Sequence, residues 1–237
     1  MLISFSGPDG AGKTTQIKKL MSFLQSRGLH VGAVQDINPD VRYHLGDDLT
    51  KYYEYLRQFD VIHTRFRLHS VENVEIMDIV QFISTGNRWL TGFSAYTSHY
   101  DAEQWNKYVT SPLLQEGKVL ISDKYAFDDI AFKTAYGCDY HWLQTLHHDT
   151  RIPDIALYLK VSRDTILQHN EHRKDLYNIL YQKPENTQRL LQTFEQLTVD
   201  YPLQAIQADG SPDEVFNNIL SYLYSIPAFS QLCNRDN

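Results

Sequence analysis

The sequence predicts an α/β fold in which a parallel β-sheet is covered by helices on both faces. Five short apolar segments have the length and composition of buried strands, at residues 2–5, 30–34, 118–122, 154–161 and 203–208. Helical patterns lie between and after these segments, and strands that alternate with helices pair in parallel. We expect the whole chain, residues 1–237, to form a single domain.

A glycine-rich stretch joins the first expected strand to the first expected helix. Its sequence is GPDGAGKT, residues 7–14, and it fits the pattern G-x-x-x-x-G-K-[ST]. An apolar helix face with Ile17, Leu20 and Leu24 follows directly. In this context the pattern indicates a P-loop, in which glycines let backbone N–H groups converge on phosphate oxygens at a helix N-terminus. The expected architecture is therefore the P-loop NTPase fold.

We expect this loop to bind ATP and Mg²⁺. Lys13 would reach the β and γ phosphates, and the hydroxyl of Thr14 would bind the metal. The other positions expected to contact the nucleotide are Gly7, Asp9, Gly10, Ala11, Gly12 and Thr15. The alternative is a glycine-rich turn that matches by chance, and the strand and helix on either side argue against it.

A second polar stretch lies at the end of the third expected strand. The sequence VLISDKYAFDDIAF, residues 119–132, places Asp123 at the carboxyl end of that strand, where its carboxylate would face the ligand of the loop. Such an acid can orient Mg²⁺ or accept a proton, and the adjacent Lys124 can hold the phosphate of an acceptor. The alternative is an aspartate that caps the following helix.

Composition restricts the class of protein. The chain is 42% hydrophobic and 22% charged, which is typical of a folded globular protein, and its net charge of -7 opposes a broad nucleic-acid surface. It has neither a leader pattern nor an apolar run as long as a transmembrane helix, so we expect a cytoplasmic protein without a membrane partner. Cys138 and Cys233 are isolated and are expected to be reduced, structural thiols.

Residues 36–100 differ from the rest of the chain in their high content of Tyr, His and Asp and their weak helical patterns. Ligands of open α/β sheets bind beyond the carboxyl ends of the strands, so we expect this excursion after the second strand to overhang the site and bind substrate. Arg65 and Arg67 are candidates for gripping an acceptor phosphate, with surface salt bridges as the alternative.

Two further helices are indicated near the middle and the end of the chain. The first contains Trp105, and Phe93, Tyr96 and Tyr100 are expected to precede it, where they could stack on a base or join the core. The second begins at the sequence SPDE, residues 211–214, which has the form of a capping box with proline in the first turn.

With these motifs, the chain resembles the thymidylate kinase family. GPDGAGKTTQ is similar to the P-loop of that family, and DKYAF, residues 123–127, is similar to its Asp-Arg-Tyr motif. PDIALYLKVSRDTIL, residues 153–167, is similar to the strand and helix that precede the family's lid. The resemblance implies ATP- and Mg²⁺-dependent phosphorylation of a nucleoside monophosphate such as dTMP by a cytoplasmic homodimer.

The resemblance also implies roles for single residues. Asp9 matches the loop carboxylate that contacts the sugar hydroxyl of the acceptor. Gly10 and Ala11 stand where some members have a loop arginine. Members without that arginine use basic residues of a helical lid. Here a candidate lid over residues 169–184 offers Arg173 and Lys174, with Arg173 as the candidate catalytic cation. A solvated basic face is the alternative for this segment.

Three departures from the family concern the acceptor. Lys124 replaces the arginine of the Asp-Arg-Tyr motif, and together with Tyr125 it remains a candidate acceptor contact. Phe132 and Lys133 stand where the family commonly has Tyr-Gln near the base, so an amide becomes a donor only. The arginine that meets thymine has no clear counterpart near residues 102–103. We therefore expect dTMP to be a weak acceptor or to be held by different contacts.

Two alternatives to a kinase of dTMP stay open at this point. One is a P-loop kinase that acts on a modified nucleotide or another small phosphomonoester. The other is a nucleotide-binding regulatory NTPase, against which the DKY motif and the basic lid-like stretch argue.

Overall fold

The protein is seen in a computed structural model that describes residues 1–35, 88–170, 181 and 183–234. Five strands form one wholly parallel sheet in the order β2-β3-β1-β4-β5. The strands are β1 (Leu2–Ser6), β2 (Val31–Gln35), β3 (Val119–Asp123), β4 (Ile155–Lys160) and β5 (Leu203–Gln207). All five expected strands are present, with bounds that differ from the expected ones by a single residue at most.

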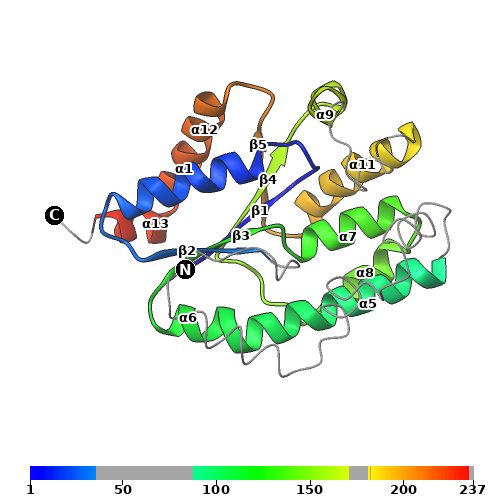
Figure 1. Ribbon diagram of the computed structural model, residues 1–237, viewed down its shortest axis with the longest axis horizontal. Helices are drawn as coiled ribbons and strands as arrows, with labels where there is room; N and C mark the ends of the chain where they lie inside the picture. Colours follow the sequence, from blue (N-terminus) through cyan, green and yellow to red (C-terminus); the bar gives the residue numbers. More distant parts are fainter. Residues whose placement is uncertain (36–87, 171–180, 182, 235–237) are drawn as a thin grey trace, which may run out of the picture.

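Helices cover both faces of this sheet (Figure 1). They are α1 (Lys13–Gln25), α5 (Arg88–Trp105), α6 (Ser111–Gln115), α7 (Ala126–Ala135), α8 (Tyr140–Leu146), α9 (Arg163–Asn170), α11 (Pro184–Asp200), α12 (Pro212–Ser225) and α13 (Pro227–Cys233). Helices α1, α12 and α13 lie on one face, and α5, α6, α7, α8 and α11 lie on the other (Figure 1). This arrangement confirms the expected α/β P-loop architecture. No helix in the described part of the chain is long and apolar enough to cross a bilayer.

Helix α5 begins far earlier than the sequence indicated. Phe93, Tyr96 and Tyr100 lie inside this helix rather than before it, so the expected start near Trp105 was wrong. A π-helical turn, Asn106–Thr110, joins α5 to α6. Among the residues of α5 whose burial the structure describes, the buried ones are small and recur at helical spacing, namely Thr91, Ala95, Ser98 and Ala102. Small side chains allow close packing against α7 and α8 but produce only a weak apolar stripe, which concealed the helix.

The ends of the last long helix match the sequence closely. Ser211 is the N-cap of α12 and accepts a hydrogen bond from the Glu214 N–H, while the Glu214 carboxylate accepts from the Ser211 N–H at 2.8 Å. This reciprocal pair confirms the expected capping box. Cys138 and Cys233 are both reduced cysteines, as the sequence led us to expect.

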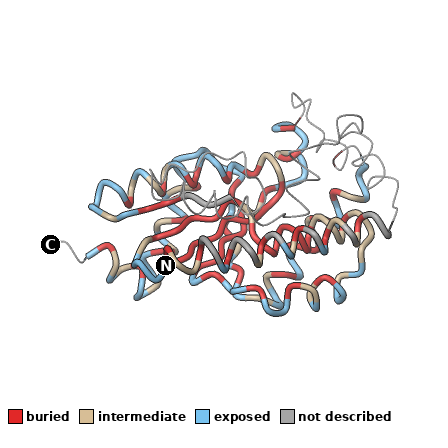
Figure 2. The backbone as a smooth tube through the Cα atoms, turned by 60° about the horizontal axis from the view of Figure 1, so that its bottom comes forward, coloured by how far each residue is buried: buried red, intermediate tan, exposed pale blue. Residues whose placement is uncertain are grey.

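The centre of the sheet is the most deeply buried part of the molecule (Figure 2). Every residue of β1 and of β3 is buried, whereas the edge strand β5 has exposed positions. β1 and β3 are neighbours, and Phe5 is in register with Asp123. The loop that leaves β1 and the polar residues that follow β3 therefore start side by side, on a rigid support.

Candidate active site

The glycine-rich loop runs from the end of β1 to the start of α1, and two of its glycines adopt a left-handed backbone that other residues rarely adopt. Gly12 is the N-cap of α1 with a φ of 85°, in the left-handed region that favours glycine. Gly10 also has a φ of 85°, and a Cβ added there would lie 3.0 Å from Nδ2 of Asn170. Among the described residues, a Cβ on Gly12 would meet nothing within 4 Å, so this part of the chain leaves the helix N-terminus open, where phosphates bind.

Lys13 places a buried cation against the inside of this loop. Its Nζ donates hydrogen bonds to the carbonyl oxygens of Gly7, at 2.7 Å, and Pro8, at 2.9 Å. The side chain is almost fully buried, and burial lowers the pKa of Lys13, an effect that the nearby Asp9 carboxylate opposes. An ammonium held in this way is poised to interact with an anion in the loop.

Thr14 and Asp123 form an oxygen pair at the junction of α1 and β3. The Thr14 hydroxyl donates a hydrogen bond of 3.1 Å to Oδ2 of Asp123. Hydroxyl and carboxylate oxygens are ligands that Mg²⁺ prefers, so this pair fits the metal. In the described parts of the chain, no group of three or more His, Cys, Asp or Glu residues could hold a metal ion. A Mg²⁺ ion at this pair would complete its shell with water and phosphate oxygens.

Asp123 does not cap the helix that follows it. The N-cap of α7 is Tyr125, whose N–H donates to the Asp128 carboxylate at 2.9 Å. The capping alternative for Asp123 is thus excluded. The Tyr125 ring is itself buried and its hydroxyl donates to the carbonyl oxygen of Arg151.

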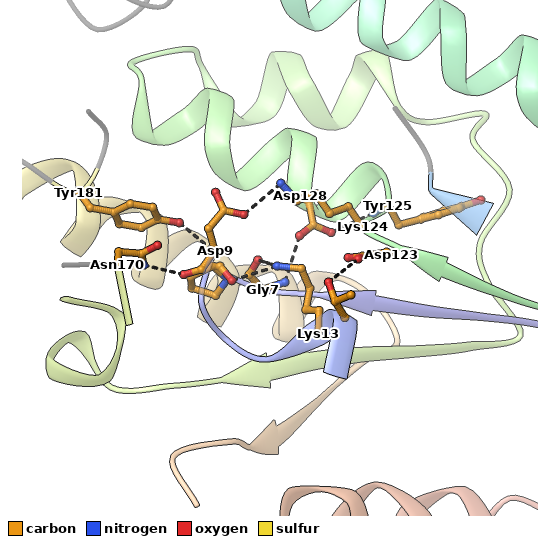
Figure 3. Close-up of polar contacts among 11 residues, drawn as sticks. Gly7, Asp9, Lys13, Asp123, Lys124, Tyr125, Asp128, Asn170 and Tyr181 are labelled. Atoms are coloured by element: carbon orange, nitrogen blue, oxygen red, sulfur yellow. Dashed lines mark hydrogen bonds and ion pairs between the residues drawn. The ribbon is translucent and has the colours of Figure 1, made fainter. Parts of the chain in front are cut away.

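Lys124 has a left-handed backbone, with a φ of 74° that a residue with a side chain adopts only at a cost. Hydrogen bonds on both sides hold this conformation: its N–H donates to the Phe5 carbonyl at 2.8 Å, and its own carbonyl accepts from the Ser122 hydroxyl at 2.6 Å. The turn directs the Lys124 ammonium to Oδ1 of Asp9, at 3.1 Å, and to within 5.2 Å of the centre of the Phe132 ring. Two charged residues of the expected site are therefore paired across the loop and the strand end (Figure 3).

Asp128 is a site residue that sequence reasoning missed. Its carboxylate accepts the Tyr125 N–H and also the Gly7 N–H, the latter at 3.0 Å, and the side chain is buried. Burial raises the pKa of Asp128, and the Lys13 ammonium opposes this rise. An acid at the third position of a helix is a capping signal, and this signal in DKYAFDD could have identified the residue.

The tip of the loop is held by three residues of the candidate lid segment, residues 169–184, to which the sequence assigned no individual role. The Asp9 N–H donates to the hydroxyl of Tyr181 at 2.7 Å, and the Asp9 carbonyl accepts from Nδ2 of Asn170 at 2.9 Å (Figure 3). Nδ1 of His169 lies 2.8 Å from the Gly10 carbonyl oxygen, to which it must donate. His169 and Asn170 are the last two residues of α9, and Tyr181 follows eleven positions later in the sequence. No local sequence pattern points to them.

Lys133 lies in a separate polar cluster between α7 and α5. Its Nζ donates to the hydroxyl of Ser94 at 2.5 Å and lies 3.9 Å from Oδ1 of Asp129. The other oxygen of Asp129 is 3.1 Å from Nε2 of His147, whose ring packs edge-on against His99. The structure thus places Lys133 between the buried Asp129 and the half-buried Ser94, on the helix that begins beside Lys124.

The remaining predicted residues divide into two sets. Ala11 and Thr15 lie in the loop and in the first turn of α1, with Ala11 buried and Thr15 exposed. Arg65, Arg67 and Arg173 lie outside the described residues.

Comparison with known proteins agrees with this geometry. The family model "Thymidylate kinase" matches residues 93–219. The chain is 24% identical to a thymidylate kinase of Dictyostelium discoideum, over 93% of this chain and 83% of the relative. It is 25% identical to one of Schizosaccharomyces pombe, over 95% and 92% of the two chains, and 25% identical to one of Acinetobacter baylyi, over 95% and 100%. Because the family model covers more than half of its length, this protein belongs to the thymidylate kinase family.

Proposed function

We propose that the protein is an ATP- and Mg²⁺-dependent kinase that phosphorylates dTMP to dTDP. In this reaction an oxygen of the dTMP phosphate bonds to the γ-phosphorus of ATP, the bond from that phosphorus to the β–γ bridging oxygen breaks, and ADP leaves. The observation that carries the proposal is that a nucleotide-binding loop and the pair of Asp9 and Lys124 meet at the carboxyl ends of β1 and β3. Family membership supports a nucleoside monophosphate kinase. It favours neither of the two alternatives, a kinase of another small phosphomonoester and a regulatory NTPase.

On the donor side, the residues of the loop bind and orient ATP. The open N-terminus of α1 after Gly12 receives the phosphates, and the Lys13 ammonium exchanges its loop carbonyls for the β and γ phosphate oxygens. Thr14 and Asp123 would hold Mg²⁺, which neutralises charge on the phosphates when it is bound.

On the acceptor side, Lys124 supplies a point charge for the phosphate of dTMP. The left-handed turn fixes the direction of this side chain, and Asp9 holds its ammonium in place until the acceptor arrives. The transition state of phosphoryl transfer is loose and asks for little covalent help, so positioning and charge neutralisation supply most of the catalysis.

The proposal extends to residues and properties beyond these pairs. Arg173 would neutralise the transferred phosphoryl group, while Arg65 and Arg67 would grip the acceptor phosphate. We further propose that residues 1–237 form a single domain, as the sequence led us to expect. We also propose a homodimer that works in the cytoplasm, as the resemblance to the family implied.

Phosphotransfer assays with the purified protein test this function. ADP formation is measured with ATP and Mg²⁺, alone and with each member of a panel that contains deoxynucleoside monophosphates, modified pyrimidine monophosphates and other phosphomonoesters. We expect ADP formation to require an acceptor, to be supported by dTMP, and to stop when EDTA removes the metal. ATP turnover that no acceptor changes would refute the kinase and indicate a regulatory NTPase.

A further inference from the structure

The main chain of Asp9 is restrained at both of its polar atoms by side chains from another part of the molecule. Its N–H donates to the Tyr181 hydroxyl and its carbonyl accepts from Nδ2 of Asn170, at 2.7 and 2.9 Å. Both partners are almost fully buried, and Asn170 is fixed in turn by donating to the Ile166 carbonyl at 2.8 Å. Asp9 lies next to Gly10, whose backbone is conformationally free, so these two bonds restrain the Asp9 main chain directly.

The restraint acts on the acceptor half of the site rather than on the donor half. The Asp9 N–H is occupied by Tyr181, so it does not belong to the amides that face the phosphates of ATP. The Asp9 side chain extends instead to Lys124, which lies at the end of β3. A shift of the Asp9 main chain would therefore move its carboxylate relative to Lys124.

We propose that Tyr181 and Asn170 are positioning residues for phosphoryl transfer, which aim the Asp9 carboxylate at Lys124 and at the acceptor. This inference rests on the proposed function, because it assigns the pair of Asp9 and Lys124 to the acceptor. His169 assists through its bond to the Gly10 carbonyl, at 2.8 Å.

The test compares two tyrosines that each lose only a hydroxyl group. Tyr181→Phe removes the acceptor of the Asp9 N–H, and Tyr140→Phe removes a hydroxyl that donates to Asp200 at 2.7 Å, on the surface. We expect Tyr181→Phe to lower kcat/KM for dTMP by about threefold to tenfold, the equivalent of one hydrogen bond between neutral groups. The KM for ATP should stay within twofold of wild type, and Tyr140→Phe should leave both constants unchanged.

A double-mutant cycle separates positioning from a merely structural role. If Tyr181 acts through the Asp9 carboxylate, the variant Asp9→Asn/Tyr181→Phe should be no poorer in kcat/KM for dTMP than Asp9→Asn alone. Asn170→Ala should behave like Tyr181→Phe in the same cycle. Additive losses, or a rise in the KM for ATP as large as the loss in kcat/KM for dTMP, would overturn the proposal.

A second measurement does not depend on the acceptor. Tyr181→Phe should raise the hydrogen-exchange rate of the Asp9 amide at least about tenfold, while the amide of Ile121 in the interior strand β3 keeps its protection. If wild-type protein fails to phosphorylate dTMP but the Asp9 amide responds in this way, the proposed function is wrong and the restraint on Asp9 stands. Unchanged exchange at Asp9 overturns the restraint whatever the acceptor is.

Discussion

The carboxylate of Asp128 accepts a hydrogen bond from the N–H of Gly7 at 3.0 Å, across 121 residues of sequence. Its second oxygen accepts from the N–H of Tyr125, the N-cap of α7. One buried side chain thereby joins the first residue of the phosphate loop to the turn that directs Lys124. The geometry of the donor half and that of the acceptor half depend on the same group.

Replacement of Asp128 by asparagine should therefore damage both halves. An amide has one oxygen, whereas the Asp128 carboxylate offers one oxygen each to the N–H groups of Gly7 and Tyr125. In the Asp128→Asn variant the amide N–H₂ would therefore lie against one of these two donors, and that hydrogen bond would be lost. We expect the free energy of unfolding to fall by about 1–3 kcal/mol and kcat to fall as well. Urea denaturation and steady-state kinetics measure the two effects.

Asp139→Asn is the matched control for this prediction. Asp139 caps α8 by accepting a single N–H, that of Trp142, at 2.7 Å, and asparagine is an equally good N-cap. The control should leave both stability and kcat unchanged. Equal losses in the two variants would show that Asp128 is an ordinary cap.

Lys13→Ala should abolish phosphotransfer without lowering the thermal stability of the nucleotide-free protein. The ammonium serves the nucleotide, and its burial opposes the charged form, as the lowered pKa of Lys13 indicates. Turnover within a few-fold of wild type, together with normal thermal unfolding, would contradict the P-loop mechanism.

The lowered pKa of Lys13 also predicts how stability depends on pH. Between this lowered pKa and the ordinary value of about 10.4, the unfolded chain binds more protons at Lys13 than the folded chain does. Stability of wild type relative to Lys13→Met should therefore rise with pH across this window and be lowest below it. Thermal melts of both proteins over a pH series provide the measurement, and a constant difference would refute the shift.

Asp123→Asn should slow the chemical step at least about a hundredfold, because it removes the charge of a carboxylate that is positioned beside the transferred phosphoryl group. ATP affinity should barely change, since Lys13 and the loop amides provide most of it. Single-turnover rates and ATP titrations separate the two quantities. A collapse of ATP binding with unimpaired single-turnover chemistry would show that Asp123 has a structural role.

Lys124 carries a cation of the site on a strained backbone, and Lys124→Gly should remove the cation and relieve the strain at once. Glycine adopts a φ of 74° freely, and we expect the free energy of unfolding to stay within about 1 kcal/mol of wild type or to exceed it. The KM for dTMP should rise sharply, because the cation is lost. Lys124→Arg keeps a cation and should retain most of the activity. A weakly affected Lys124→Gly enzyme would remove Lys124 from the acceptor site.

Lys133→Gln tests whether the acceptor is held by contacts unlike those of the family. Lys133 bonds to Ser94 and lies near Asp129, so an amide there changes both the charge and the donors of that cluster. We expect the ratio of kcat/KM values across the acceptor panel to shift, whereas Lys118→Gln, which breaks a 3.2 Å ion pair with Glu116, should not change it. The idea is wrong if dTMP is the best acceptor, with kcat/KM of about 10⁴ M⁻¹s⁻¹ or above, and Lys133→Gln leaves that value unchanged.

Residues whose position follows from local rules could be predicted from the sequence, and residues placed by tertiary packing could not. The pairing of Thr14 with Asp123 was within reach because both lie next to strands that are neighbours in a parallel sheet. Tyr181 reaches Asp9 across 172 residues, a contact that no spacing in the sequence encodes. The early start of α5 was concealed because its buried residues, such as Thr91 and Ala95, carry little apolar surface.

The close packing of the loop tip against α9 constrains how this enzyme could change. A side chain at Gly10 would collide with Asn170 and His169, and the Ala11 side chain is already enclosed. An arginine at either position, as some family members have, would need a rebuilt end of α9 as well. Such a change takes several coordinated substitutions. A kinase whose loop tip packs against α9 in this way would therefore need a catalytic cation from another part of the chain.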